Sequence, residues 1–266
     1  MKRAFLYIDI LGFEKLVINN EDKIERIFKI LDGLNSHTHN HFFDLQTVVF
    51  SDTILIFNSS DTKEEQIHYY VTYLIEYAQE LFYRLANINV YFRGILTFGE
   101  FNCNQLKNIQ AYYGSALINA YNQEKELKGF GLFVDKNISN EVVVFDKVEF
   151  SEKFYFILLC QSIKNLYIQT GGILPVDIGL LTDTDDFYRI DEDLGFFREV
   201  EYLMNKHPSE KVREKYSKVY ELYKADLPLF FKKFESEGFL PFTVCSDYTG
   251  NTNPFELMSE QELNLV

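Results

Sequence analysis

The sequence is poor in cysteine and contains no long apolar segment. Its three cysteines, Cys103, Cys160 and Cys245, are far apart and form no CxxC pair, which argues against a disulfide scaffold or a zinc site. No run approaches the roughly 18 apolar residues that a membrane-spanning helix needs. The apolar stretch after the basic opening stops at Asp9, too early for the core of a signal peptide. These absences predict a soluble, cytoplasmic protein that does not bind membranes.

The sequence also lacks a block of basic residues. Lys and Arg number 26 against 40 Asp and Glu, so the formal net charge is -14. A chain of this charge repels nucleic-acid backbones unless a basic patch is concentrated locally, and we expect no polymeric nucleic-acid partner. A small anionic substrate is compatible with the charge, because bound divalent cations can invert the local field. G-x-S-x-G and P-loop motifs are absent as well.

What the sequence does contain is enough apolar material for a full core. Hydrophobic residues make up 47% of the chain and aromatic residues 17%, which excludes disorder and suits one or two domains. The patterns run strand, helix, hairpin, helix, strand, helix, strand, which is typical of a mixed α/β (α+β) fold with a ferredoxin-like palm core. The expected strands are 4–10, a hairpin over 47–57, 90–98, 132–135 and 141–145, and the expected helices are 23–34, 63–86, 116–128, 196–206 and 209–224.

The patterns weaken after about residue 146. We therefore expect a first domain over 1–145 and, over 146–266, a mixed α/β C-terminal extension packed on it. The acidic stretch 180–193 has a turn-rich character, and we interpret it as a solvated, turn-forming face, because its order of residues does not match a calcium-binding EF-hand loop. His37, His39 and His41 alternate along the chain as metal ligands on a strand would, but they follow a predicted helix end in a polar stretch, which favours a solvated loop.

Two aspartates interrupt apolar strand patterns. Asp9 ends the first pattern and Asp52 lies at the tip of the predicted hairpin. A two-metal phosphoryl-transfer site is usually built from two carboxylates placed in this way. Two Mg²⁺ or Mn²⁺ ions between them would lower the pKa of an attacking hydroxyl and neutralise a triphosphate. A single Asp at a strand end is more often a cap or turn residue, so the neighbouring segments decide between the two interpretations.

Two further segments contain groups suited to phosphate. Leu11-Gly12-Phe13-Glu14 joins the first strand to a helix, so its backbone N–H groups would face phosphate oxygens, and Gly12 permits their close approach. Arg93 opens a strand that runs through Gly94 to Gly99-Glu100. Its planar guanidinium can pair with the same phosphates.

Together with Tyr113-Gly114-Ser115-Ala116, these segments resemble, in order, the catalytic domain of class III nucleotidyl cyclases. Asp9-Ile10-Leu11-Gly12-Phe13 matches the family's first metal-binding segment, and Asp52 follows 52 − 9 = 43 residues later, close to the family's spacing. Arg93 matches the arginine of an R-x-G-I-x-x-G-E strand, with the first glycine moved up beside it. The resemblance covers about residues 3–145.

The resemblance implies a site for a nucleoside triphosphate and two divalent cations, Mn²⁺ or Mg²⁺. Asp9, Ile10 and Asp52 would form the metal group. Residues 10–14 and Arg93 would hold the triphosphate. The helix after Gly114 resembles the family's dimer-interface helix, so the resemblance also implies a homodimer in which each active site is completed by the partner chain.

The chain departs from the family's pattern at the positions that recognise the nucleotide base and at the transition-state asparagine. At the two positions that read adenine in adenylyl cyclases this chain has Val48 and Ala111, neither of which offers a charged or hydrogen-bonding side chain. The family's transition-state asparagine falls at Ile118. Asn119 is one position away, a rotation of about 100° on a helix, and is our candidate for that catalytic role.

One branch of the family shares these departures. The Pycsar anti-phage cyclases have an Arg-Gly strand and a helix similar to Gly114–Glu124, and they make cyclic UMP or cyclic CMP that signals to a separate effector protein. The resemblance therefore implies a UTP or CTP cyclase, with UTP favoured. Val48, Phe50, Tyr112 and Tyr113 are the candidates for the base pocket, although the same residues also suit core packing in a chain with 18 Tyr and 26 Phe.

Two other functions stay open at this point. The first is a purine cyclase, guanylyl or adenylyl, that reads its base with other residues. The second is a degenerate cyclase-like domain that binds nucleotide or a protein partner without turnover. Retention of both aspartates argues against the second, whereas the altered helix after Gly114 argues for it.

Overall fold

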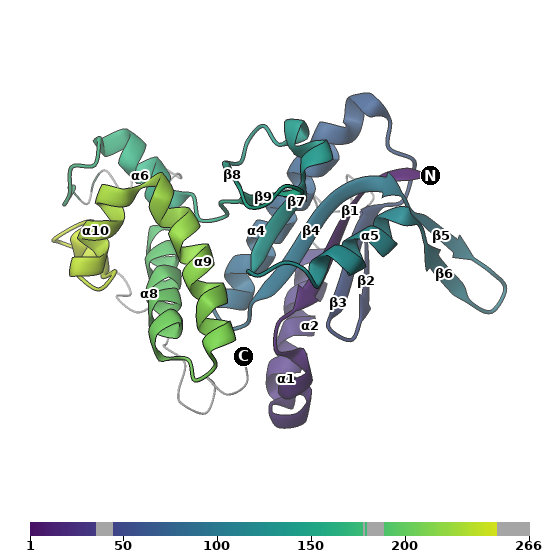
Figure 1. Cartoon of the computed structure of the whole chain (residues 1–266), viewed down its shortest axis with the longest axis horizontal. Helices are drawn as coiled ribbons and strands as arrows, with labels where there is room; N and C mark the ends of the chain where they lie inside the picture. The colour runs from purple at the N-terminus through teal and green to yellow at the C-terminus, as the bar shows by residue number, and fades with distance from the viewer. Residues whose placement is uncertain (36–44, 178, 180–188, 249–266) are drawn as a thin grey trace. The chain divides into compact units, whose positions relative to one another are not determined.

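The computed structural model describes residues 1–35, 45–177, 179 and 189–248 (Figure 1). The chain divides into two compact units, Met1–Leu85 with Val90–Leu159 and Ala86–Asn89 with Cys160–Val266. The first unit therefore continues past the predicted boundary at 145/146, because two later strands complete its sheet. The three-histidine segment and most of the acidic stretch lie outside the described residues.

The first unit is built on a seven-stranded mixed sheet with strand order β2-β3-β1-β4-β7-β9-β8 (Figure 1). β1 is an interior strand, between β3 and β4, and is buried on both faces, as its apolar run predicts. The strands are β1 (Lys2–Ile10), β2 (Leu45–Phe50), β3 (Thr53–Asn58), β4 (Phe92–Glu100), β7 (Gly131–Asp135), β8 (Lys147–Glu149) and β9 (Phe154–Ile157).

The first four strands of this sheet form a ferredoxin-like core. β1 pairs antiparallel with both β3 and β4, and β2 pairs antiparallel with β3. The helices α1 (Phe13–Asn19) and α2 (Glu21–Asn35) follow β1, and η1 (Glu64–Gln66) and α4 (Ile67–Ala86) follow β3. A β-α-β-β-α-β chain with this strand order is the split βαβ arrangement, so the predicted mixed α/β fold with a ferredoxin-like core is confirmed.

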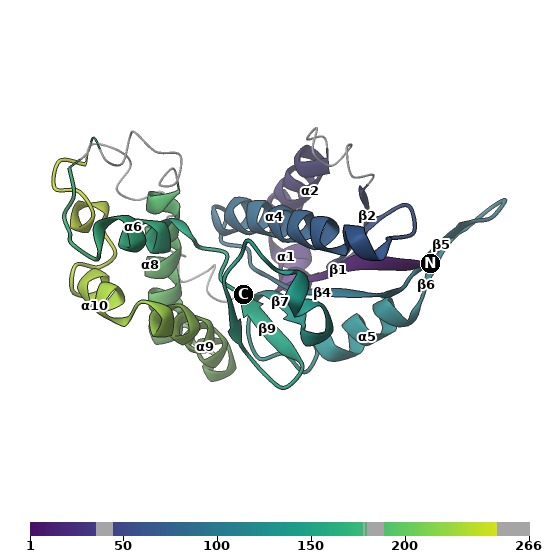
Figure 2. The ribbon, with the colours of Figure 1, turned by 90° about the horizontal axis from the view of Figure 1, so that it is seen from above.

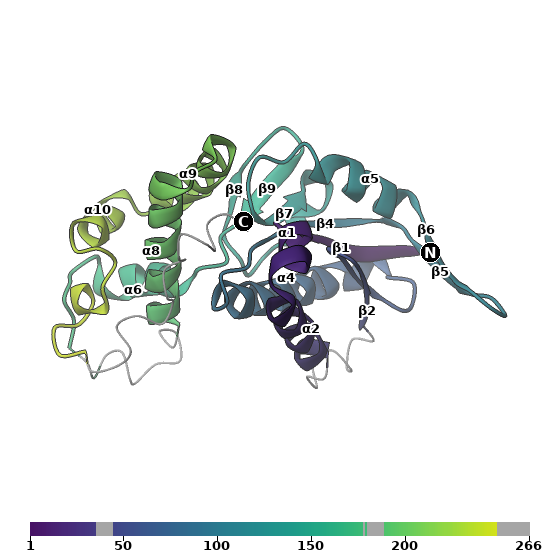
Figure 3. The same ribbon diagram turned by 90° about the horizontal axis from the view of Figure 1, so that it is seen from below.

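Helices cover the two faces of the sheet unequally. α2 and α4 lie on one face and α5 (Ser115–Glu124) lies on the other (Figures 2 and 3). A Cβ built on Gly99 of β4 would be 3.4 Å from the Cβ of Ala116, so this position of β4 faces α5. Since Gly99 is opposite Arg3 and side chains alternate along a strand, the odd-numbered residues of β1 and β4 share this face, which we call the α5 face.

A two-stranded hairpin that the sequence patterns did not predict precedes α5. β5 (Asn102–Gln105) and β6 (Gln110–Tyr113) pair with each other only, and they project away from the sheet (Figures 1 and 2). α5 itself ends at Glu124 rather than at the predicted residue 128. The predicted strand 141–145 was wrong, because this segment follows the 3₁₀ helix η2 (Lys136–Glu141) without joining the sheet.

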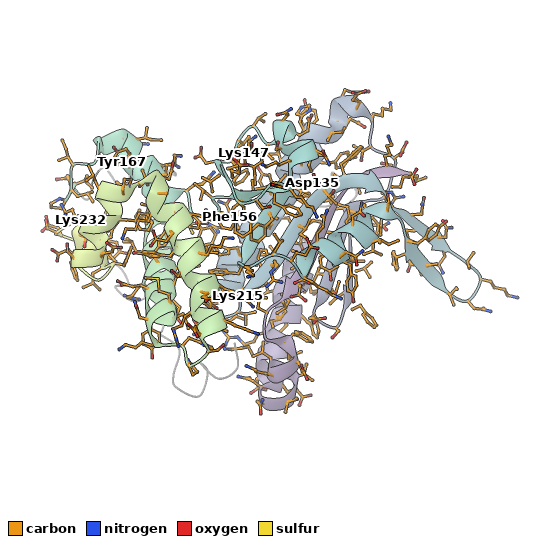
Figure 4. The ribbon with its side chains drawn as sticks, in the orientation of Figure 1. Asp135, Lys147, Phe156, Tyr167, Lys215 and Lys232 are labelled. Carbon is orange, nitrogen blue, oxygen red and sulfur yellow. The ribbon has the colours of Figure 1, made fainter. Side chains whose placement is uncertain are left out.

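β9 is held against β7 by aromatic packing. Phe156, labelled in Figure 4, lies with its ring centroid 5.4 Å from that of Phe133. Asp135, at the end of β7, accepts a hydrogen bond from the backbone N–H of Asn137 and so caps the 3₁₀ turn that follows. The pairings β4–β7, β7–β9 and β9–β8 thereby extend the core beyond the four ferredoxin-like strands.

The second unit is helical in its described part. Its helices are α6 (Ser162–Thr170), α8 (Ile190–Lys206), α9 (Glu210–Asp226), α10 (Pro228–Ser236) and the short η4 (Pro241–Thr243). A cluster of aromatic rings fills its centre, where Phe197 contacts Tyr223, Phe231 and Phe239. The predicted helices 196–206 and 209–224 are present, and the second buries Tyr216, Val219, Tyr220 and Tyr223.

The expectation of a solvated, turn-forming stretch up to residue 193 was wrong at its end. α8 begins at Ile190, and Asp193 is fully buried within it. The Asp193 carboxylate accepts a hydrogen bond from the backbone N–H of Ile163 at 3.2 Å, which satisfies one of the unpaired donors at the start of α6. Among the described residues, no helix combines the length and the apolar character that crossing a bilayer requires.

Candidate active site

Asp9 and Asp52 lie side by side at one end of the central strands. The backbone N–H of Ile10 donates to the backbone carbonyl of Asp52 at 2.9 Å, and Asp9 is directly opposite Thr53 in the β1–β3 register. The β2–β3 turn places Ser51 at φ 57, in the left-handed region that tight hairpins need. Both aspartates are half-buried. The structure therefore brings together the backbones of the two aspartates that the sequence separates by 43 positions.

Two hydroxyl groups lie next to these carboxylates. Tyr7 Oη is 3.5 Å from Thr53 Oγ1, and both residues share the α5 face with Asp9. Burial raises the pKa of Tyr7, and the negative charges of Asp9, Glu124 and Asp52 raise it further. The phenol therefore stays protonated and remains a hydrogen-bond donor among carboxylates at neutral pH.

Arg93 is opposite Asp9 on β4, but its guanidinium is directed to Glu124. Asp9 and Arg93 are partners in the β1–β4 register. Arg93 Nη1 forms a buried ion pair with the Glu124 carboxylate and also donates to the Glu124 carbonyl at 3.1 Å. Its Nε donates to the carbonyl of Gly129 at 3.0 Å. Arg93 therefore fixes the end of α5 to the sheet beside the two aspartates, and its charge is already paired.

The segment after Asp9 has the geometry of a tight strand-to-helix turn. Gly12 adopts φ 71 and ψ 10 as the residue that precedes α1, a conformation that glycine adopts at no steric cost. The Leu11 N–H donates to the carbonyl of Tyr91, so this backbone donor is already used. Ile10 and Phe13 are buried by their side chains, so only their backbone groups can face a ligand.

Val48 and Phe50 lie on the α5 face with Asp9. In the β2–β3 register Phe50 is opposite Thr53 and Val48 is opposite Leu55, and residues two apart on a strand share one face. Val48 is half-buried, whereas Phe50 is 80% exposed next to Asp52. An aromatic ring this exposed beside a carboxylate pair is available to stack on a ligand.

Tyr112 and Tyr113 lie farther from the aspartates of their own chain. The Tyr112 ring packs against Phe57 and Phe101, at centroid distances of 6.1 Å and 6.3 Å. Phe57 is four residues along β3 from Thr53, or about 13 Å at the usual rise of a strand. Tyr113 is half exposed on the projecting hairpin, and its hydroxyl accepts a hydrogen bond from Asn104. The two tyrosines are therefore not next to Asp9 within one chain.

α5 presents a small inner face and an exposed outer face. Ala116, Ala120 and Glu124, four residues apart, are its buried positions. On the outer side Ile118 is 60% exposed, and Tyr121 and Asn119 are exposed as well. Asn119 therefore points away from the sheet of its own chain. It can contribute to a site only through another copy of the chain or a rearranged helix.

The two carboxylates fit a divalent cation whose remaining coordination positions are filled by a bound ligand. Within the part of the chain that the structure describes, no group of three or more His, Cys, Asp and Glu side chains can hold a metal ion. Mg²⁺ is commonly bound by one or two carboxylates with substrate phosphates supplying further oxygens. Asp9 and Asp52 match that pattern, and the Ile10 carbonyl is the only oxygen that this residue can add.

Sequence reasoning missed three groups of this site: Glu124 as the partner of Arg93, and the Tyr7 and Thr53 hydroxyls. The four-residue spacing of Ala116, Ala120 and Glu124 is a signal for a shared helix face, but a glutamate in that stripe does not reveal its partner. Tyr7 looks like an ordinary strand residue until the β1–β3 register places it beside Thr53.

Comparisons with known proteins give structural similarity only. No protein-family profile matches the sequence, and no curated protein matches it either. Solved structures of nucleotidyl cyclase domains match 59% of the chain.

Three of these structures illustrate the similarity. The guanylyl cyclase domain of the RhoGC fusion protein from the aquatic fungus Blastocladiella emersonii has 11% identity, 93% of its chain covered and a TM-score of 0.47. The adenylyl cyclase CyaB from P. aeruginosa has 11% identity, 93% covered and a TM-score of 0.43. The guanylate cyclase domain of RhGC from Catenaria anguillulae, in complex with GTP, has 10% identity, 95% covered and a TM-score of 0.45. Likeness at this level assigns neither a family nor an activity to the chain.

Proposed function

We propose that this protein is a divalent-metal-dependent nucleotidyl cyclase that converts a pyrimidine nucleoside triphosphate, UTP or CTP, to its 3′,5′-cyclic monophosphate and pyrophosphate. The observation that carries the proposal is the juxtaposition of Asp9 and Asp52 at one end of the β1–β3 ladder. Their order and spacing along the chain are those of the class III cyclase resemblance.

The reaction is an in-line displacement at the α-phosphorus. The 3′-oxygen of the ribose forms a bond to the α-phosphorus, the bond from this phosphorus to the bridging oxygen of pyrophosphate breaks, and the hydroxyl proton passes to water. Divalent cations, when bound, lower the pKa of the 3′-hydroxyl and neutralise charge on the triphosphate. Asp9 and Asp52 would hold them, with the Ile10 carbonyl as a further oxygen ligand.

The triphosphate would lie along the backbone of residues 10–14. Gly12 allows the close approach of phosphate oxygens to this backbone. Because Arg93 is paired with Glu124 in this structure, we propose that it orients α5 and Asp9 in the resting enzyme. Direct pairing of Arg93 with phosphate would require exchange of its Glu124 partner.

The base would stack on Phe50 and contact Val48, which share the α5 face with Asp9. The apolar Val48 side chain cannot make the hydrogen bond by which adenylyl cyclases read adenine. The loss of this contact argues against adenine, and the resemblance to the anti-phage cyclases is the reason for proposing a pyrimidine. The resemblance to anti-phage cyclases extends the proposal to the product, which would act on a separate effector protein.

The site would be completed by a second copy of the chain. Asn119 is exposed on α5, and Tyr112 and Tyr113 are displaced along the sheet from Asp9 of their own chain. A two-fold dimer through the α5 face would bring the α5 and hairpin residues of one protomer to the aspartates of its partner. The exposed apolar side chains Ile118 and Tyr121 suit such an interface.

A product assay tests the proposal. The purified chain is incubated with Mn²⁺ and, separately, ATP, GTP, CTP or UTP, and the products are resolved by chromatography and mass spectrometry. Cyclic UMP or cyclic CMP with an equal amount of pyrophosphate is expected. Turnover of ATP or GTP alone would replace the pyrimidine proposal by a purine cyclase. Nucleotide binding without any product would identify a degenerate domain.

A further inference from the structure

Tyr7 is a polar residue in the most buried strand of the sheet. It lies in the middle of β1, opposite Leu55 of β3 and Ile95 of β4, and only 3% of its surface is exposed. A phenylalanine would supply the same ring to this apolar setting. Burying the additional hydroxyl costs free energy unless it makes a hydrogen bond, so the hydroxyl calls for a specific explanation.

The hydroxyl is placed at the carboxylate end of the α5 face. Tyr7 and Asp9 are two residues apart on β1 and so share that face. The Tyr7 hydroxyl is 3.5 Å from the Thr53 hydroxyl. Thr53 in turn is opposite Asp9 in the register and follows Asp52 in the chain.

The register brings Thr53 especially close to Asp9. Because the N–H of Ile10 bonds to the carbonyl of Asp52, the next pair, Asp9 and Thr53, is of the non-hydrogen-bonded type. Residues in such pairs have Cα atoms only about 4.5 Å apart and close side chains. Two hydroxyl groups, one on the buried Tyr7 and one on the half-buried Thr53, are thereby assembled beside Asp9.

We propose that the Tyr7 and Thr53 hydroxyls form a pair that orients the Asp9 carboxylate for cation binding. This inference rests on the proposed metal site. Both residues would act through Asp9 and are therefore positioning residues. Hydrogen-bond donors behind a metal ligand fix its rotamer, and their loss typically costs about 10- to 100-fold in metal affinity.

Equilibrium binding of Mn²⁺, followed by its electron paramagnetic resonance signal, tests this role without relying on turnover. The full-length protein is titrated alone and with 3′-deoxy-UTP, which has no attacking hydroxyl. Tyr7→Phe, which keeps the ring, is expected to weaken Mn²⁺ binding by about tenfold or more. Thr53→Val, which removes the second hydroxyl, should also weaken Mn²⁺ binding.

Tyr83→Phe provides the matched control. Tyr83 lies on α4, away from the aspartates. It is equally buried, and its hydroxyl donates a hydrogen bond to the carbonyl of Leu159. Unchanged Mn²⁺ affinity is expected for this variant. If Tyr7→Phe fails to fold, as judged by circular dichroism, Thr53→Val alone carries the test.

The outcomes separate this inference from the proposed function. Wild-type Mn²⁺ affinity in folded Tyr7→Phe and in Thr53→Val, with binding lost in Asp9→Asn, would overturn the positioning role and leave the metal site in place. Mn²⁺ binding that is unaffected by Asp9→Asn would overturn the metal site itself.

Discussion

The backbone N–H of Ile10 donates to the backbone carbonyl of Asp52 across 2.9 Å. This bond closes the end of the β1–β3 ladder and joins the segment after the first carboxylate to the second carboxylate. Because it depends on main-chain atoms, it fixes the spacing of the two aspartate backbones whatever their side chains bind. The pair is therefore a preformed feature of the sheet.

Asn substitutions at the two aspartates should separate chemistry from folding. Asp9→Asn and Asp52→Asn keep the side-chain shape and remove the charge. We expect turnover to fall at least 100-fold, which corresponds to a loss of about 2.7 kcal/mol of transition-state stabilisation. The circular dichroism spectrum should be unchanged. Asp22→Asn, at an exposed position of α2, is the control and should retain wild-type turnover. Full activity in either site variant would remove that residue from the metal group.

The ion pair of Arg93 and Glu124 should be important for stability. Both side chains are buried, so Glu124→Ala leaves an uncompensated cation and should lower the free energy of unfolding by about 3–5 kcal/mol, measured by urea denaturation. The double variant Arg93→Met with Glu124→Leu removes both charges and should recover much of that loss. Glu25→Ala, which breaks an exposed pair with Lys29, should cost less than about 0.5 kcal/mol. Equal effects of Glu124→Ala and Glu25→Ala would contradict a structural role for the buried pair.

Phe50→Ala should affect substrate binding rather than folding. The ring is 80% exposed, so its removal should change the free energy of unfolding by no more than about 0.5 kcal/mol. Stacking on a base contributes about 1–3 kcal/mol, and we expect KM for the triphosphate to rise roughly tenfold. Leu229→Ala, at an equally exposed apolar position of α10, is the control and should leave KM unchanged. An unchanged KM in Phe50→Ala would exclude Phe50 from the base pocket.

Ile118→Glu should disrupt the proposed dimer. The residue is exposed on the outer side of α5, and a charge there would be buried against the partner at a high cost. Analytical ultracentrifugation should show a shift to monomer, and turnover should be lost with it. Ile168→Glu, equally exposed on the second unit, should leave both unchanged. A dimer of normal strength in Ile118→Glu would place the interface elsewhere.

A mixing experiment uses turnover to test whether each active site is shared between two protomers. Asp9→Asn and Asn119→Ala are each expected to be inactive. A mixed dimer contains one site with an intact Asp9 from one chain and an intact Asn119 from the other, so mixing the two proteins should restore turnover. Persistent inactivity after subunit exchange would show that the sites are not shared in this way.

The pattern of strands and helices in the first unit could be predicted because it depends on local periodicity. β1, the β2–β3 hairpin and α4 follow apolar repeats that have one dominant period. The segment 141–145 was mispredicted for the same reason. Val142, Val143 and Val144 favour a strand locally, yet no strand among the described residues pairs with them, and Val143 and Val144 are exposed. Strand formation depends on a partner that the segment itself does not encode.

The residues of the candidate site could be predicted from the sequence, but most of the contacts between them could not. The spacing of Asp9 and Asp52 pointed to a shared site because a hairpin tip and a strand end are local features. The partner of Arg93 is 31 residues away on another element, and the partner of Asp193 is 30 residues away. Such pairings follow from the packing of helices on the sheet or on each other, which no local pattern specifies.

The most direct test of the central claim is the position of the cations. Crystals grown with Mn²⁺ and 3′-deoxy-UTP would be measured at the manganese absorption edge, where anomalous scattering locates the metal without assumptions about its ligands. We predict manganese peaks at about 2 Å from carboxylate oxygens of both Asp9 and Asp52, with the triphosphate against residues 10–14. Manganese located away from these two carboxylates, with the nucleotide bound, would contradict the account.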